Sequence, residues 1–153
     1  MGKSGVKRGG ENLFYGQNRH GIDPKGRVIL PTKYREKLGE VFYITKGLAS
    51  CLFVYPESEW SELKEKLDAL PMSTGGDVQR FFYTNMAEVS ADKQGRVLLP
   101  SHLREYASLD KDVVIAGVGK RIEIWDAKTF DDMNALPKMD PDEILMKMES
   151  LGI

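Results

Sequence analysis

The sequence predicts a mainly β fold with short helices, an α+β protein built from two copies of one small unit. Three observations carry this prediction. The stretches DPKGRVILP (residues 23–31) and DKQGRVLLP (residues 92–100) are nearly identical. Short runs rich in β-branched and aromatic residues follow both stretches, which is typical of strands. Apolar residues at helical spacing appear mainly after these runs. A repeat of this kind indicates duplication of a structural unit.

Each copy begins with a strand that leads into a tight turn. We expect these strands in residues 13–23 and 81–92. In the Asp-x-x-Gly-Arg turn, the aspartate can accept hydrogen bonds from nearby backbone and the glycine tolerates a positive φ. The next strand, RVILP or RVLLP, ends at its proline, which has no N–H for a β ladder.

A short helical segment follows each of these strands. TKYREKLG (residues 32–39) and SHLREYAS (residues 101–108) have helical composition. Thr32 and Ser101 come directly after proline and are the candidate N-caps, because a hydroxyl there can accept a hydrogen bond from a free N–H of the first turn.

Two strands and a helix complete each copy. The strands are EVFYIT (residues 40–45) with CLFVYP (51–56), and DVVIAG (112–117) with RIEIWD (121–126), joined by the glycine-bearing turns KGLAS and VGK. The first closing helix, residues 56–71, has an apolar stripe formed by Trp60, Leu63, Leu67 and Leu70. Its counterpart at residues 126–137 has a weaker stripe.

The predicted organisation has five parts. Residues 1–12 form a flexible extension, 13–70 the first repeat, 71–80 a linker, 81–137 the second repeat and 138–153 a helical tail. MSTGGDVQR, within residues 72–80, is expected to be a loop. The tail helix carries Ile144, Leu145, Met148 and Leu151 on one side, and so short a helix should pack on the body or on a neighbouring subunit.

Composition excludes several classes of protein. Hydrophobic residues make up 41% and charged residues 29% of the 153 residues, as in a soluble globular domain. No apolar run reaches membrane-spanning length. The single cysteine, Cys51, rules out an internal disulfide, fits a reducing cytoplasm, and is expected to be a small core residue. His20 and His102 have no carboxylate cluster at metal-ligand spacing, so we expect no metal and no cofactor.

The charge is unevenly distributed along a nearly neutral chain. The formal net charge is −1, yet residues 1–40 contain nine Lys and Arg against four Asp and Glu. Residues 121–153 contain four basic and eight acidic residues. A basic and an acidic end can therefore coexist within a neutral total, and the acidic end is equally well explained as a solvated helical face.

The two turns are the candidate functional site. Arg27 and Arg96 follow the turn glycines, and a guanidinium presents a planar fork of donors that suits phosphate oxygens or guanine O6 and N7. Asp23 and Asp92 could brace these arginines. Lys25 and Lys93 nearby add charge directed at phosphate. Arg35 and Arg104, eight residues after the turn arginines, repeat as well and are further DNA-binding candidates. A second interpretation remains open: the Asp-x-x-x-Arg pair stabilises the turn and duplication has simply copied it.

Several motifs together resemble the MraZ family of bacterial regulators. They are FYGQNRHGIDPKGRVILPTKYRE, GLASCLFVYPESEW, DKQGRVLLPSHLREYASL and RIEIWD, and the resemblance covers about Phe14 to Phe130. It implies an AbrB-like fold, in which duplicated swapped-hairpin β-α-β-β units interlock into a double-split β-barrel. The family's Asp-x-x-x-Arg motif falls on Asp23, Arg27, Asp92 and Arg96.

The resemblance also implies a function. The chain would assemble as a homo-oligomeric ring, bind G-rich repeats in double-stranded DNA upstream of the division and cell-wall gene cluster, and act as a transcriptional regulator, usually a repressor. It would be cytoplasmic and nucleoid-associated, with no membrane and no small-molecule substrate as partner. Two alternatives remain: an antitoxin-like oligomeric interaction module that does not bind DNA, and an enzyme, for which the sequence offers no motif.

Overall fold

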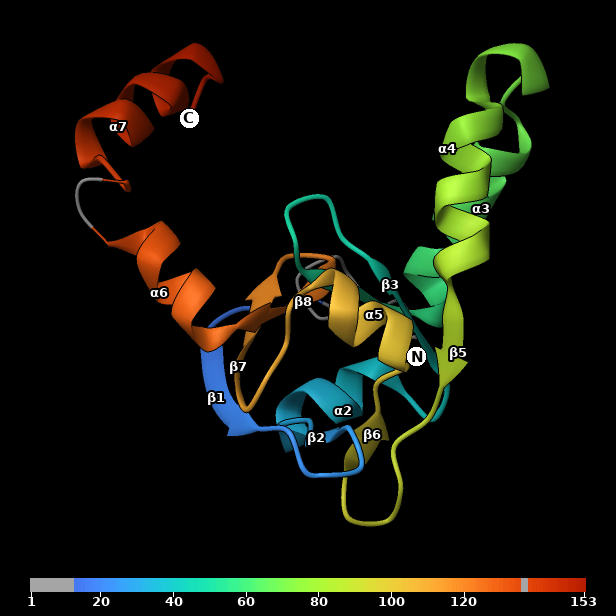
Figure 1. Cartoon of the computed structure of the whole chain (residues 1–153). Helices are drawn as coiled ribbons and strands as arrows, with labels where there is room; N and C mark the ends of the chain where they lie inside the picture. The colour runs from blue at the N-terminus through green and yellow to red at the C-terminus, as the bar shows by residue number, and fades with distance from the viewer. Residues whose placement is uncertain (1–12, 136–137) are drawn as a thin grey trace, which may run out of the picture.

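The computed structural model describes residues 13–135 and 138–153, and its strands form two antiparallel sheets (Figure 1). The large sheet has six strands in the order β1-β7-β8-β4-β3-β5. They are β1 (Gln17–Gly21), β3 (Phe42–Lys46), β4 (Leu52–Pro56), β5 (Ala87–Val89), β7 (Asp112–Val118) and β8 (Arg121–Asp126). The small sheet pairs β2 (Arg27–Ile29) with β6 (Arg96–Leu98). The predicted flexible extension, residues 1–12, lies outside the described residues.

The sheet order shows how the two repeats interlock. β1 of the first repeat pairs with β7 of the second, while β5 of the second repeat pairs with β3 of the first. β4 and β8 join the two halves at the centre of the large sheet, and β2 and β6 join them again in the small one. The α+β class and the duplicated, interlocked units are therefore confirmed. Among the described strands, the pairing places β1 and β5 at the two ends of the large sheet.

The main core lies between the large sheet, the small sheet and two short helices. These helices are α2 (Thr32–Leu38) and α5 (Ser101–Tyr106), one from each repeat. The core side chains are almost fully buried and come from both repeats; the largest are Tyr34, Phe14, Phe42, Leu30, Ile44, Leu52, Leu99 and Leu103. Because each repeat contributes strands to the other's half of the sheet, neither has a complete core of its own.

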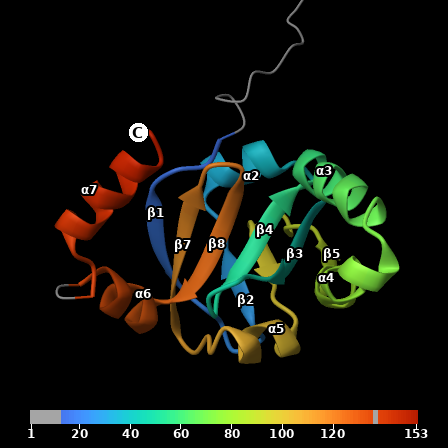
Figure 2. The same cartoon turned by 90° about the horizontal axis from the view of Figure 1, so that it is seen from above.

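Two helical arms extend from opposite ends of the large sheet (Figures 1 and 2). One arm contains α3 (Glu57–Asp68) and α4 (Met72–Asn85), next to β3 and β5. The other contains α6 (Ala127–Asn134) and α7 (Pro141–Ser150), on the β1 side. Figure 2 shows the strands of the large sheet side by side between the two arms.

The predicted apolar stripe of α3 is partly confirmed. Trp60 and Leu67 are buried, Leu63 is half-buried and Leu70 is exposed. Trp60 packs between aromatic rings of β3 and α4, with centroid distances of 6.0 Å to Tyr43 and 5.5 Å to Tyr83. Burial of such rings anchors the arm to the sheet.

Two local predictions are wrong. Residues 72–80, expected as a loop, belong to α4, which also takes Phe81–Asn85 from the strand predicted at residues 81–92. The hydrogen bond from Gln79 Nε2 to the Leu67 carbonyl, 2.7 Å, and the packing of Tyr83 on Trp60 hold this helix against α3. Thr32 and Ser101 are not N-caps. Pro31 and Pro100 occupy those positions, and neither helix has a side-chain cap.

The tail forms the predicted helix, but it does not pack on the body. Ile144, Leu145 and Leu151 are 46%, 53% and 72% exposed. Packing on a neighbouring subunit therefore remains the prediction for this apolar side. Among the described residues, no helix has the length and apolar composition required to cross a bilayer.

Candidate nucleic-acid interface

The small sheet is a two-stranded ribbon with one buried and one exposed face. Val28 pairs with Val97, and both side chains are almost completely buried. Arg27 pairs with Leu98, and Ile29 with Arg96. Because successive side chains of a strand point to opposite faces, these four flanking residues share the face away from the core. Burying a valine side chain stabilises the folded state by roughly 1.5–3 kcal/mol relative to leaving it in water. The two valines therefore fix which face of the ribbon is turned outward.

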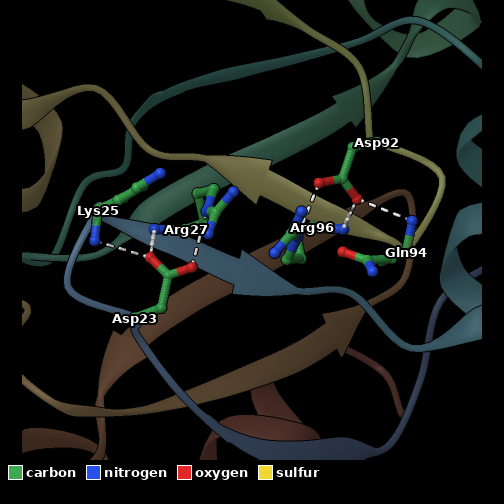
Figure 3. Close-up of polar contacts among 6 residues, drawn as sticks. All are labelled: Asp23, Lys25, Arg27, Asp92, Gln94 and Arg96. Atoms are coloured by element: carbon green, nitrogen blue, oxygen red, sulfur yellow. Dashed lines mark hydrogen bonds and ion pairs between the residues drawn. The ribbon is translucent and has the colours of Figure 1, made fainter.

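Each arginine is held by the aspartate of its own turn (Figure 3). Asp23 Oδ1 accepts hydrogen bonds from the backbone N–H groups of Lys25 and Arg27, both at 2.9 Å, and Asp23 Oδ2 accepts one from Arg27 Nε at 2.7 Å. The second turn repeats this geometry. Asp92 accepts from the Gln94 and Arg96 N–H groups at 2.9 Å and from Arg96 Nε at 2.7 Å.

The backbone of the two turns is equally matched. The Gly26 N–H donates to the Asp23 carbonyl and the Gly95 N–H to the Asp92 carbonyl, both at 2.9 Å. Gly26 has a φ of 82° and Gly95 a φ of 81°, a region that L side chains rarely occupy. The glycine in Asp-x-x-Gly-Arg is therefore required by the turn itself.

These contacts lower the pKa of both aspartates. For each, the hydrogen bond from the arginine backbone N–H is the largest cause. Partial loss of solvent comes next and acts in the opposite direction, and the guanidinium hydrogen bond lowers the pKa further. A carboxylate that accepts several hydrogen bonds is stabilised in its charged form. Both aspartates are therefore ionised at neutral pH and hold the guanidinium groups in a fixed direction.

The guanidinium groups remain accessible on the ribbon. The side chains of Arg27 and Arg96 are 26% and 32% exposed. Among the described residues, only Nε of each donates to a side chain, and the partner is the aspartate of the same turn. Figure 3 shows the two arginines toward the middle of the ribbon, with Asp23 and Asp92 on either side. The turn-stabilising pair is thus present, and it orients the arginines while their terminal nitrogens stay free of these contacts.

The other cationic candidates differ in position. Lys25 and Lys93 lie exposed on the turns, at non-equivalent places, because the repeat aligns Lys25 with Gln94. Arg35 and Arg104 are half-buried, and their Nε atoms donate to the carbonyls of Leu30 and Leu99 at 3.0 and 2.9 Å. Lys25 and Lys93 therefore lie on the turns beside the two arginines. Arg35 and Arg104 instead use part of their guanidinium groups to bind backbone carbonyls.

Two residues of the exposed ribbon face were missed from the sequence. Ile29 and Leu98 are 46% and 56% exposed, although both are large and apolar. A period-2 reading of RVIL and RVLL would have placed each on the same side as its arginine. Which side is outward depends on the pairing of β2 with β6, a contact between repeats.

Cys51 is confirmed as a buried residue. It is 1% exposed, and burial raises the pKa of its thiol to about 12. A thiol with such a pKa is not a nucleophile at neutral pH. Among the described residues, no group of three or more His, Cys, Asp or Glu side chains could hold a metal ion.

A duplicated chain whose repeats exchange strands and present paired Asp–Arg turns on a ribbon belongs to the class of interlocked two-repeat α+β proteins. The family model described as "MraZ protein, putative antitoxin-like" matches residues 13–78 and 82–144. The chain therefore belongs to the MraZ family, as the sequence motifs predicted.

Curated relatives agree with this assignment. The chain is 51% identical over 144 residues to the transcriptional regulator MraZ of Acetivibrio thermocellus, covering 92% of this chain and all of the relative. It is 50% identical to that of Heliobacterium modesticaldum over 139 residues, 89% of this chain and 96% of the relative. It is 46% identical to that of Clostridium tetani over 144 residues, 92% of this chain and all of the relative. These relatives are named as regulators, in line with the expectation that the family is not enzymatic.

Proposed function

We propose that this chain is a sequence-specific DNA-binding transcriptional regulator whose β2–β6 ribbon contacts double-stranded DNA. The main support is that Arg27 and Arg96 lie on the same exposed face of one ribbon, each fixed by its own aspartate. The major groove of B-DNA admits a two-stranded β-ribbon. Relatives of half-identical sequence carry the name of transcriptional regulator.

The chemistry of the ribbon suits a guanine-containing site. An arginine whose Nε is held by a carboxylate still presents its terminal nitrogens to O6 and N7 of guanine. Ile29 and Leu98, beside the arginines in the ribbon register, supply apolar contact of the kind that thymine methyl groups accept. Lys25 and Lys93 on the turns contact phosphates, and these contacts make the affinity strongly dependent on salt.

The finer part of the proposal follows the family resemblance. The sites are G-rich repeats upstream of the division and cell-wall gene cluster, the usual effect is repression, and the working form is a homo-oligomeric ring in the cytoplasm, associated with the nucleoid. The exposed apolar side of α7 is available for contact between subunits.

Binding to a labelled duplex with G-rich repeats tests the proposal. Arg27→Ala and Arg96→Ala should each weaken binding by about 1–3 kcal/mol, as expected for an arginine that reads guanine. Arg80→Ala is the matched control, since Arg80 is exposed on α4, away from the ribbon. Normal binding by the Arg27→Ala/Arg96→Ala double variant would reject the site.

A second pair of variants separates recognition from turn stability. Arg27→Lys and Arg96→Lys keep the charge next to each aspartate but lack the planar fork. They should remain folded, as judged by thermal unfolding, and lose discrimination between the G-rich duplex and a scrambled one. Unfolding of these variants would support the purely stabilising interpretation of the Asp–Arg pair.

The alternative, an interaction module without DNA binding, is favoured by one observation: the exposed apolar residues of α7. If the wild-type protein shows no preference for the G-rich duplex at any salt concentration, this alternative replaces the proposal.

A further inference from the structure

Arg35 and Arg104 lie against the turn of the opposite repeat. A methyl group built on Gly95 would be 2.8 Å from Cζ and Nε of Arg35. One built on Gly26 would be 2.7 Å from Cζ and 2.9 Å from Nε of Arg104. The guanidinium of each repeat therefore covers the turn glycine of the other, and the contact is reciprocal.

Hydrogen bonds fix these guanidinium groups at the point where the repeats cross. Arg104 Nε donates to the Leu99 carbonyl at 2.9 Å, and the Leu99 N–H donates to the Gly26 carbonyl at 3.0 Å. The other half has the same two hydrogen bonds, and Arg35 Nη2 also donates one to Thr32 Oγ1 at 2.9 Å. Arg35 Nε donates to the Leu30 carbonyl and the Leu30 N–H to the Gly95 carbonyl, both at 3.0 Å. Each arginine thus holds the backbone segment that binds the opposite turn.

We propose that Arg35 and Arg104 are reciprocal positioning residues for the recognition arginines: Arg104 orients the turn of Arg27, and Arg35 orients the turn of Arg96. This inference rests on the proposed DNA-binding function and deepens it. The two turns then act as one rigid unit, because each is supported by a side chain from the other repeat. It also gives a second reason for glycine at both turns, since any side chain there would displace the covering guanidinium.

The salt dependence of binding distinguishes this role from direct phosphate contact. The plot of log affinity against log salt has a negative slope, and removing one phosphate contact makes it less steep by about one. If Arg35 and Arg104 are positioning residues, Arg35→Gln and Arg104→Gln lower the affinity and leave this slope unchanged. A reduced slope in both variants would overturn the proposal and assign the two arginines to the phosphates.

A double-mutant cycle tests which turn each arginine serves. Arg104→Lys retains the charge but not the planar group that covers Gly26. Its effect on affinity should be at least about threefold smaller in an Arg27→Ala background than in the wild type, because Arg104 acts on Arg27 through the turn that Gly26 belongs to, and residues coupled through a shared backbone segment are not additive. In an Arg96→Ala background its effect should be unchanged. Arg35→Lys should show the opposite pairing, so each arginine is the control for the other. Equal coupling to both turns, or none to either, would overturn the proposal.

Hydrogen exchange gives a readout that needs no DNA. In Arg104→Lys, the amides of residues 23 and 25–27 should exchange faster while those of residues 92–96 stay as in the wild type, and Arg35→Lys should reverse the pattern. Unchanged exchange at both turns, or equal acceleration at both, would reject positioning. If the exchange pattern is as expected but the wild type does not bind DNA, the proposed function fails and the coupling of the turns stands.

Discussion

At the residue scale, the aspartate of each turn is the central group of the site. Asp23 and Asp92 each accept two backbone N–H groups and one guanidinium N–H. One carboxylate therefore closes the turn and directs the arginine at the same time. These contacts are compatible with both interpretations left open by the sequence, turn stabiliser and recognition element.

The lowered pKa of these aspartates predicts how stability depends on pH. A carboxylate whose pKa is lower in the folded than in the unfolded protein stabilises the fold. This stabilisation is fully present when the pH is above the unfolded-state pKa, about 3.9, and is lost as the pH falls through the folded-state pKa. The free energy of unfolding contributed by both pairs should therefore be constant from pH 5 to 8 and decrease below about pH 4. Chemical denaturation of the wild type and of Asp23→Asn/Asp92→Asn across this range measures it. If the difference in free energy of unfolding between the two proteins changed between pH 6 and 8, the lowered pKa of the two aspartates would not be its cause.

At the scale of elements, α4 shows how packing overrides local composition. Its sequence contains Gly75 and Gly76, which disfavour a helix by about 0.5–1 kcal/mol each relative to alanine. The helix is nevertheless formed, because Gly75 is buried close to Leu70 and the helix packs on α3 through Gln79 and Tyr83. Tyr83 also donates a hydrogen bond to Asp68, at 2.6 Å.

The two glycines of α4 should respond oppositely to alanine. A methyl group on Gly75 would lie 2.6 Å from Leu70 Cβ, so Gly75→Ala should destabilise the protein by about 1–3 kcal/mol through overpacking. A methyl group on Gly76 would meet only Met72 Cγ at 3.7 Å, so Gly76→Ala should stabilise it by about 0.5–1 kcal/mol. Denaturation with urea gives both values. The same sign for both variants would show that the contact with Leu70 does not matter.

At the scale of the whole molecule, strand exchange makes the two repeats interdependent. β1 and β5 each complete the other repeat's half of the sheet, and β2 and β6 pair only across repeats. A fragment of residues 13–86 keeps β1 to β4. It loses β7 and β6, the partners of β1 and β2, and also β8 and β5, which pair with β4 and β3.

The isolated first repeat should therefore not fold as a monomer. Val28 and Leu30, both 1% exposed in the full chain, would lose β6, the strand paired with β2, and the core residues of the second repeat. We expect a fragment of residues 13–86 to be unfolded or self-associated in sedimentation and circular dichroism. A folded, monomeric fragment would contradict the interdependence of the repeats.

The proposed ring predicts dependence on the number and spacing of DNA sites. One ribbon makes few contacts, whereas several ribbons on one assembly bind tandem repeats with a high effective concentration. A duplex with several G-rich repeats should bind at least 10²-fold more tightly than one with a single repeat, and changed spacing should remove much of this gain. Native mass measurement with each duplex reports how many subunits are engaged. Equal affinity for all spacings would argue against multivalent binding.

The sequence alone determined the duplication, most of the strands and helices in each repeat, and the Asp-x-x-Gly-Arg turns. These features depend on local patterns: alternating apolar residues, a glycine that must adopt positive φ, and an aspartate four residues before its arginine. The same patterns identified Cys51 as a core residue, because it lies within an apolar run.

Only the tertiary structure decided how the copies are arranged and which ribbon face is outward. The pairing of β2 with β6, the exposure of Ile29 and Leu98, and the contact of Arg35 with Gly95 all join residues that are distant in sequence. The helix at residues 72–85 also depends on such packing. Local composition does not encode these contacts, because their free energy comes from surfaces that meet only when both repeats have folded together.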